Sequence, residues 1–256
     1  MTGVFFLFFL HASLGLMAAL AFVPDRAGAK FFKLCAASAA FMTMAGLWLV
    51  VRQQGTGSWL VIASAAFLVL VMLYNRSRHF GWKRAHAPLL YAALACGVAA
   101  VVFSDAHPRH RLMLVSTDLT SALLMGAAAG AMILGHYYLV VLDLPIQALR
   151  RLTILLIVAI ALRTVVVAIV LAGPTHPGVA EARTVAAGLL SIDGVFVWMR
   201  LLFGIAGPLS LVWFIWKTVE IRSTQSATGI LYVQLFLVMA GELLAKYLRV
   251  AVGIPL

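Results

Sequence analysis

The sequence predicts an all-α integral membrane protein, with about eight transmembrane helices in one bundle and a single transmembrane domain over residues 1–256. Hydrophobic residues make up 64% of the chain and charged residues 11%. In soluble domains about 45–50% of the residues are apolar and about 25% are charged. The mean hydropathy is +1.07. The apolar residues form long runs, and about 20 such residues are enough for a helix to cross the hydrocarbon core of a bilayer.

Proline, glycine and charged residues interrupt these runs, as they commonly do between helices. In chain order the interruptions are Pro24-Asp25-Arg26, Gly55-Thr56-Gly57, the basic stretch 75–86, the polar stretch 105–111, Pro145 with Arg150-Arg151, Gly173-Pro174 with His176-Pro177, and 217–228. The predicted helices are therefore 4–23, 31–51, 57–75, 87–104, 114–141, 151–172, 194–216 and 229–251.

Two connections have features of their own. The longest, 173–193, has apolar residues at roughly helical spacing in its second half, so it is either a short surface helix or a plain connector. In the last connection, Thr228 is predicted to cap the eighth helix.

Basic residues lie mainly in the connections and predict the orientation of the chain. The connections after the first, third, fifth and seventh helices hold eleven Lys and Arg, and those after the second, fourth and sixth hold four. By the positive-inside rule the first set is cytoplasmic, and both termini are periplasmic if the membrane is a bacterial inner membrane. The net charge of +11 is thus explained by topology and by contact with the lipid bilayer, and no nucleic-acid partner is expected.

Several kinds of chemistry are excluded by missing motifs. Cys35 and Cys96 both lie in apolar runs, and no CxxC or CxxCH is present, which excludes a c-type haem attached through the usual motif and a cysteine-ligated iron–sulfur cluster. The sequence also lacks HExxH, Walker A and GxSxG patterns.

His136 lies inside the fifth apolar run, and an ionisable group at such a position predicts a functional site. Gly126 and Gly130 precede it on a face of small residues that allows a helix or a flat macrocycle to approach closely. A neutral imidazole is a good axial haem ligand, and His79 or His86 on the same predicted side are candidates for the second ligand. The alternatives are a quinone head-group site and a simple hydrogen bond between helices.

A second group of polar residues is predicted in the outer third of the membrane. Depth along the helices places His11, Asp118, Arg200 and Glu242 there, and Glu242 and Lys246 are four residues apart, as in a helical ion pair. His11, Asp118 and Glu242 are candidate catalytic residues of a proton relay or quinol-oxidation site, and His11 is also a candidate cofactor or metal ligand. The alternative is a salt-bridge network that fixes helix packing.

Two further expectations follow from position alone. His11 and His136 lie on opposite sides of the membrane, so they should not ligate one haem together. Arg163 lies near the middle of the sixth helix and needs a partner, either a cofactor group such as a haem propionate or a carboxylate on a neighbouring helix.

These observations favour a membrane-embedded electron-transfer subunit that carries a b-type haem, a quinone site or both. The span count and buried histidines resemble the polytopic anchor subunits of bacterial respiratory complexes, and this resemblance implies other membrane or peripheral redox subunits as partners. Such a chain is at most a non-catalytic or quinone-reactive subunit of an oxidoreductase complex. Two alternatives stay open: a transporter, with Gly207-Pro208 as a break in the seventh helix, and a structural or assembly subunit without chemistry of its own.

Overall fold

The computed structural model describes residues 2–104, 111–141, 144–172, 192–252 and 256. Its α-helices are α1 (Thr2–Leu20), α2 (Ala29–Gln54), α3 (Trp59–Phe80), α4 (Lys83–Ser104), α5 (Arg111–Val140), α6 (Gln147–Ala172), α8 (Ile192–Leu201), α9 (Gly207–Glu220) and α10 (Thr224–Tyr247). Shorter segments are the 3-10 turn η1 (Asp25–Ala27) and the π-helical segments η3 (Leu202–Ala206) and η4 (Leu248–Val252).

The prediction of an all-α membrane bundle is confirmed. Within the described ranges, eight helices are long and apolar enough to cross a membrane, with α8, η3 and α9 together forming one of them. Large apolar side chains on their outer faces are exposed, including Phe41 at 66%, Trp59 at 70% and Phe236 at 68%. In a multi-pass membrane protein these side chains face the lipid.

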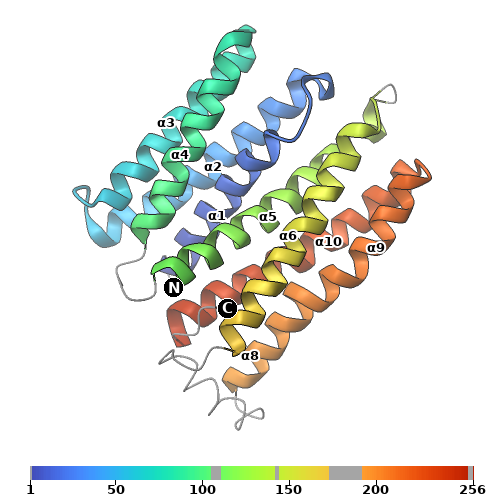
Figure 1. The fold of residues 1–256 in the computed structure, drawn as a ribbon. Helices are drawn as coiled ribbons and strands as arrows, with labels where there is room; N and C mark the ends of the chain where they lie inside the picture. Colours follow the sequence, from blue (N-terminus) through green and yellow to red (C-terminus); the bar gives the residue numbers. More distant parts are fainter. Residues whose placement is uncertain (1, 105–110, 142–143, 173–191, 253–255) are drawn as a thin grey trace.

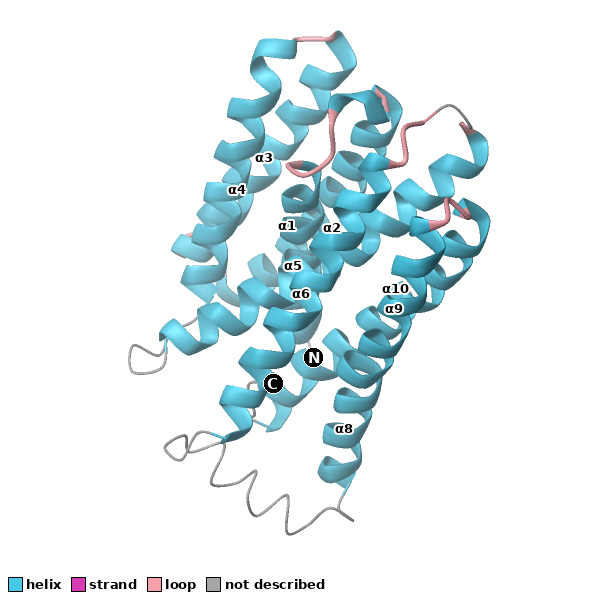
Figure 2. Cartoon of the chain, turned by 45° about the vertical axis from the view of Figure 1, so that its right-hand side comes forward, coloured by secondary structure: helices cyan, strands magenta, loops and turns pink. Residues whose placement is uncertain are grey.

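The helices form two groups of four that meet at α1 and α5 (Figure 1). In the first group α1 contacts α2 and α4, and α3 contacts α2 and α4. In the second group α5 contacts α6 and α10, and α9 contacts α6 and α10. Both ends of the chain lie at one end of the bundle, and the connections α1–α2, α3–α4, α5–α6 and α9–α10 gather at the other (Figures 1 and 2). The connections richest in Lys and Arg therefore share one end.

Glycines allow α1 and α5 to touch along their backbones. A Cβ atom added to Gly15 would lie 1.7 Å from the carbonyl oxygen of Ala122, and one added to Gly126 would lie 1.8 Å from the carbonyl carbon of Gly15. One turn further along, Gly130 faces Ala19. The pairs advance in the same direction along both helices, so α1 and α5 run parallel, and the predicted face of small residues is the contact surface.

Most helices extend further into the polar connections than predicted, whereas α1 ends at Leu20, before the predicted end at residue 23. The stretch 75–86 was predicted as a loop, but α3 and α4 occupy all of it except Gly81 and Trp82. Arg and Lys are good helix formers, so only Gly81, with its left-handed φ of 71°, breaks the helix. Likewise, the prediction that Thr228 caps the eighth helix is wrong. Thr228 lies inside α10, where its hydroxyl donates a hydrogen bond to the Thr224 carbonyl. The possible surface helix within 173–191 lies outside the described residues.

Candidate functional site

The carboxylate of Glu242 lies at the centre of a buried network of charged side chains. Arg163 on α6 donates from Nε to Glu242 Oε1 at 3.0 Å and from Nη2 to Oε2 at 3.1 Å. Arg200 on α8 donates from Nη2 to Oε1 at 2.9 Å. All three side chains are fully buried. The predicted carboxylate partner of Arg163 is therefore Glu242.

Two more donors complete the coordination of this carboxylate. Ser121 on α5 donates to Glu242 Oε2 at 2.5 Å, and Lys246 on α10 donates to the Ser121 hydroxyl at 2.6 Å and lies 3.5 Å from the same carboxylate oxygen. The predicted contact between Glu242 and Lys246, four residues apart, is confirmed. Glu242 thus accepts from five donor atoms, which fills the roughly four lone-pair directions of a carboxylate.

A second carboxylate, Asp118 on α5, extends the network to α1. His11 Nε2 lies 3.7 Å from Asp118 Oδ1, and Arg249 in η4 donates to that same oxygen. The structure therefore brings together the residues whose depth predicted an outer cluster. Within the described part of the chain, both ring nitrogens of His11 and the Oδ2 atom of Asp118 have no hydrogen-bond partner.

The backbone departs from regular α-helix near two arginines of the network, Arg200 and Arg249. Arg200 lies in the last turn of α8, two residues before the π-helical segment η3, and Arg249 lies within η4. Short π-helical stretches inside α-helices are frequent at functional sites. Gly204 and Gly241 pack backbone against backbone, and a Cβ added to Gly204 would lie 1.5 Å from Arg200 Nη1. The Arg200 side chain therefore passes over Gly204, where no Cβ atom blocks it, and reaches the carboxylate of Glu242.

Sequence reasoning missed some members of the network. Ser121 and the Thr117 carbonyl, which accepts from Arg163 Nη1 at 3.0 Å, were not singled out. Their only signal is spacing, since both lie within one turn of Asp118 on α5. The carbonyl oxygen of Leu256 also accepts from Arg163, at 3.1 Å.

The network can do two different things. Glu242 is saturated by donors and holds α5, α6, α8 and α10 together, as a packing element would. The His11–Asp118 pair keeps free lone pairs on both residues, so a proton can be held there. The pair is thus the part of the network suited to proton transfer.

His136 lies in a separate pocket near the other end of α5. Asp118 and His136 are 18 residues apart, which is about 27 Å along a helix, so the predicted separation of His11 from His136 is confirmed. The pocket has a volume of about 440 Å³. Its lining comes from α2, α5 and α10: Lys30, Phe31, Leu34, Met132, Ile133, His136, Tyr137 and Tyr232.

A hydrogen bond joins the two polar rings of this pocket. The Tyr232 hydroxyl and His136 Nδ1 are 3.0 Å apart, and the two rings meet edge to face. The structure does not place His79 or His86 with them. His79 lies in a different pocket and contacts Lys33 at 3.5 Å, and His86 lies in a third and contacts the Ser77 carbonyl at 3.3 Å. Among the described residues there is no group of three or more His, Cys, Asp or Glu side chains fit to hold a metal ion.

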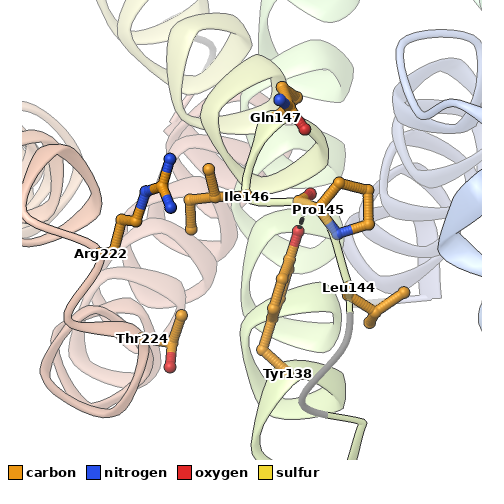
Figure 3. A pocket seen from close by; sticks show the side chains of 7 residues that line it. All are labelled: Tyr138, Leu144, Pro145, Ile146, Gln147, Arg222 and Thr224. Carbon is orange, nitrogen blue, oxygen red and sulfur yellow. Dashed lines mark hydrogen bonds between the residues drawn. The ribbon is translucent and has the colours of Figure 1, made fainter.

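A further cavity of about 380 Å³ lies where the α5–α6 and α9–α10 connections meet (Figure 3). The Tyr138 hydroxyl points at the Pro145 carbonyl and donates to it at 2.6 Å. Arg222, which has a positive φ of 58°, lies on the opposite side. Tyr138 therefore ties the end of α5 to the connection that follows it.

No protein-family model, no curated protein and no solved structure matches this chain.

Proposed function

We propose that this chain is a membrane-embedded electron-transfer subunit of a larger respiratory-type complex, with a quinone head-group site in the pocket of His136 and Tyr232. The observation that carries the proposal is the hydrogen-bonded imidazole–phenol pair in a pocket with a largely apolar wall. The proposal includes a bacterial inner membrane with periplasmic termini, which puts this pocket on the cytoplasmic side.

The pocket offers what a quinone needs. A quinone head group is a flat ring with two carbonyl oxygens, and its polyprenyl tail is apolar. The imidazole, the Tyr232 hydroxyl and the Lys30 ammonium supply hydrogen-bond donors, while Leu34, Met132 and Ile133 supply an apolar wall. Tyr232 and Leu34 are themselves exposed on the outer face of the bundle, at 47% and 55%, so a tail has a path into the bilayer.

The chemistry divides between this chain and its partners. Reduction of a quinone to a quinol takes two electrons, supplied by a peripheral redox subunit, and two protons. We assign the transfer of these protons to the carbonyl oxygens to His136 and Tyr232, whose polar atoms share one hydrogen bond in this pocket. At the opposite end, we assign proton transfer to His11 and Asp118, and Glu242 and Arg163 hold that site in place.

The same pocket gives a b-type haem weaker support. His136 would be one axial ligand, but His79 and His86 lie in other pockets, so none of the predicted pairs forms. Arg163, proposed as a propionate partner, is already bonded to Glu242. The quinone alternative uses the observed His136–Tyr232 pair and needs no second histidine.

Replacement of His136 is expected to weaken quinone binding. For His136→Leu, the dissociation constant of a short-chain quinone, titrated calorimetrically into the detergent-purified protein, should rise about tenfold, because a hydrogen bond to the head group is lost. Tyr232→Phe should give a smaller rise in the same direction.

His79→Leu is the matched control, since it removes an imidazole at the same end of the bundle but outside this pocket. Its dissociation constant should equal that of the unmodified protein. Unchanged affinity in His136→Leu, or an equal loss in His79→Leu, would contradict the proposed site.

One observation favours a second candidate function, a proton-coupled transporter. The seventh span is interrupted by η3 directly before Gly207-Pro208, and Arg200 of the charged network lies beside this interruption. Transporters often place their sites at such interruptions. Solute uptake by proteoliposomes that is lost in a folded Asp118→Asn variant would support transport, and quinone binding without any uptake would support the first candidate.

A further inference from the structure

A basic cavity lies at the end of the bundle where the connections richest in Lys and Arg gather. Its volume is about 310 Å³, roughly ten times the share of one water molecule in the liquid. It is enclosed by the end of α1 with the turn that follows, the end of α3, the first two turns of α4 and the start of α6. Segments that are far apart in the sequence therefore build one site.

The cavity has more basic side chains than acidic ones to pair with them. Arg78 is held in place, because it donates to Asp25 at 2.6 Å and its guanidinium stacks on the Phe32 ring at 3.9 Å from the centroid. Lys83 and Arg151 also line the cavity and are exposed. Within the described residues neither side chain has an ion pair or hydrogen bond. Three basic side chains thus face one carboxylate.

Apart from His86, the remaining wall of the cavity is mainly apolar and leads to the lipid-facing surface. Leu20 and Leu90 are buried beneath the basic residues, and Tyr91, on the same turn as Leu90, is 61% exposed. Because α1, α3, α4 and α6 are membrane-spanning helices, their ends lie at the level of the lipid headgroups. The site therefore combines surplus positive charge with an apolar edge at headgroup depth.

We propose that this cavity binds the phosphate of an anionic phospholipid, with Lys83 and Arg151 as its two principal contacts and the acyl chains along Leu90 and Tyr91. Inorganic phosphate carries the same charged group but makes no use of the apolar edge, so a free anion would bind more weakly. Basic pockets between transmembrane helices are suited to such lipids. This inference does not depend on the quinone site.

The test compares two double variants of equal charge. In Lys83→Gln/Arg151→Gln the two unpaired cations of the cavity are removed. In Lys33→Gln/Arg76→Gln two cations are removed from the neighbouring cavity at the same end of the bundle. Binding of phosphatidylglycerol, of phosphatidylcholine and of sodium phosphate to the detergent-purified full chain is measured by native mass spectrometry and by thermal stabilisation.

The unmodified protein should bind phosphatidylglycerol in preference to phosphatidylcholine, and the first double variant should weaken that binding about thirtyfold, since each basic residue near a membrane surface contributes about fivefold. The second double variant should change it less than about threefold, and Lys83→Arg should retain it. Equal losses in both double variants would overturn the proposal in favour of general surface charge. Stabilisation by sodium phosphate equal to that by phosphatidylglycerol would overturn the assignment to a lipid.

Discussion

Glu242→Ala is expected to lower the free energy of unfolding by about 3–5 kcal/mol. The substitution removes the shared partner of Arg163, Arg200 and Lys246 and leaves three basic groups buried without it. A buried charge that loses its partner costs far more than the pair contributes when intact. Thermal and denaturant unfolding of the purified protein in detergent would measure the loss.

Glu220→Ala is the matched control for this experiment. Glu220 also pairs with a lysine, Lys217 at 3.0 Å, but both side chains are about half exposed. Such surface pairs contribute no more than about 1 kcal/mol, so this variant should unfold close to the unmodified protein. Equal effects at the two glutamates would show that the network around Glu242 is not a source of stability.

A double variant separates the pair from its surroundings. Arg200→Met removes one of the cations that Glu242 neutralises. If the two groups stabilise each other, the loss in Glu242→Ala/Arg200→Met should be smaller than the sum of the two single losses. Strictly additive losses would contradict a direct interaction.

Gly126→Val is expected to have the second large effect, because it would separate α1 from α5. The added Cβ alone would lie within 2 Å of the Gly15 backbone, which cannot move away as a flexible side chain would. Overpacking of this kind costs about 1–3 kcal/mol and at times more. Cysteine cross-linking between the two helices and thermal unfolding would report the separation.

Gly229→Ala is the control for this substitution, since a Cβ at Gly229 on α10 has no atom within 4 Å. Alanine is the better helix former by about 1 kcal/mol, so this variant should be as stable as the unmodified protein or more stable. A similar loss of stability at Gly126 and Gly229 would contradict the assigned backbone contact.

Hydropathy, together with the proline, glycine and charged residues between the apolar runs, predicted the helices well because the bilayer fixes the length of an apolar span. They predicted the helix ends less well, since Arg76 and Arg78 are polar but continue α3, and Lys83 is polar but begins α4. Depth along each span also predicted that His11, Asp118 and Glu242 lie at one level, because 1.5 Å per residue converts position into height.

Rotation about the helix axes was not predictable in the same way. Lipid-facing and buried faces are both apolar in this chain, so the sequence does not show which face of α10 turns towards α5. For that reason Tyr232 was not singled out as the partner of His136, and Ser121 was not recognised as a contact of Glu242. His79 and His86 lie at the same end of the bundle as His136, as predicted, but they contact Lys33 and the Ser77 carbonyl instead of His136. Depth along a helix does not specify position within the plane of the membrane.

The backbone contact between α1 and α5 has a consequence for biosynthesis. The glycine face of α1 meets its native neighbour, α5, only after more than 100 further residues have been translated. Until then His11 has no Asp118 to contact, and α1 to α4 are present without the second group of helices. Insertion of α5 thus places the first helix of the second group against the first group before the other helices of the second group are made.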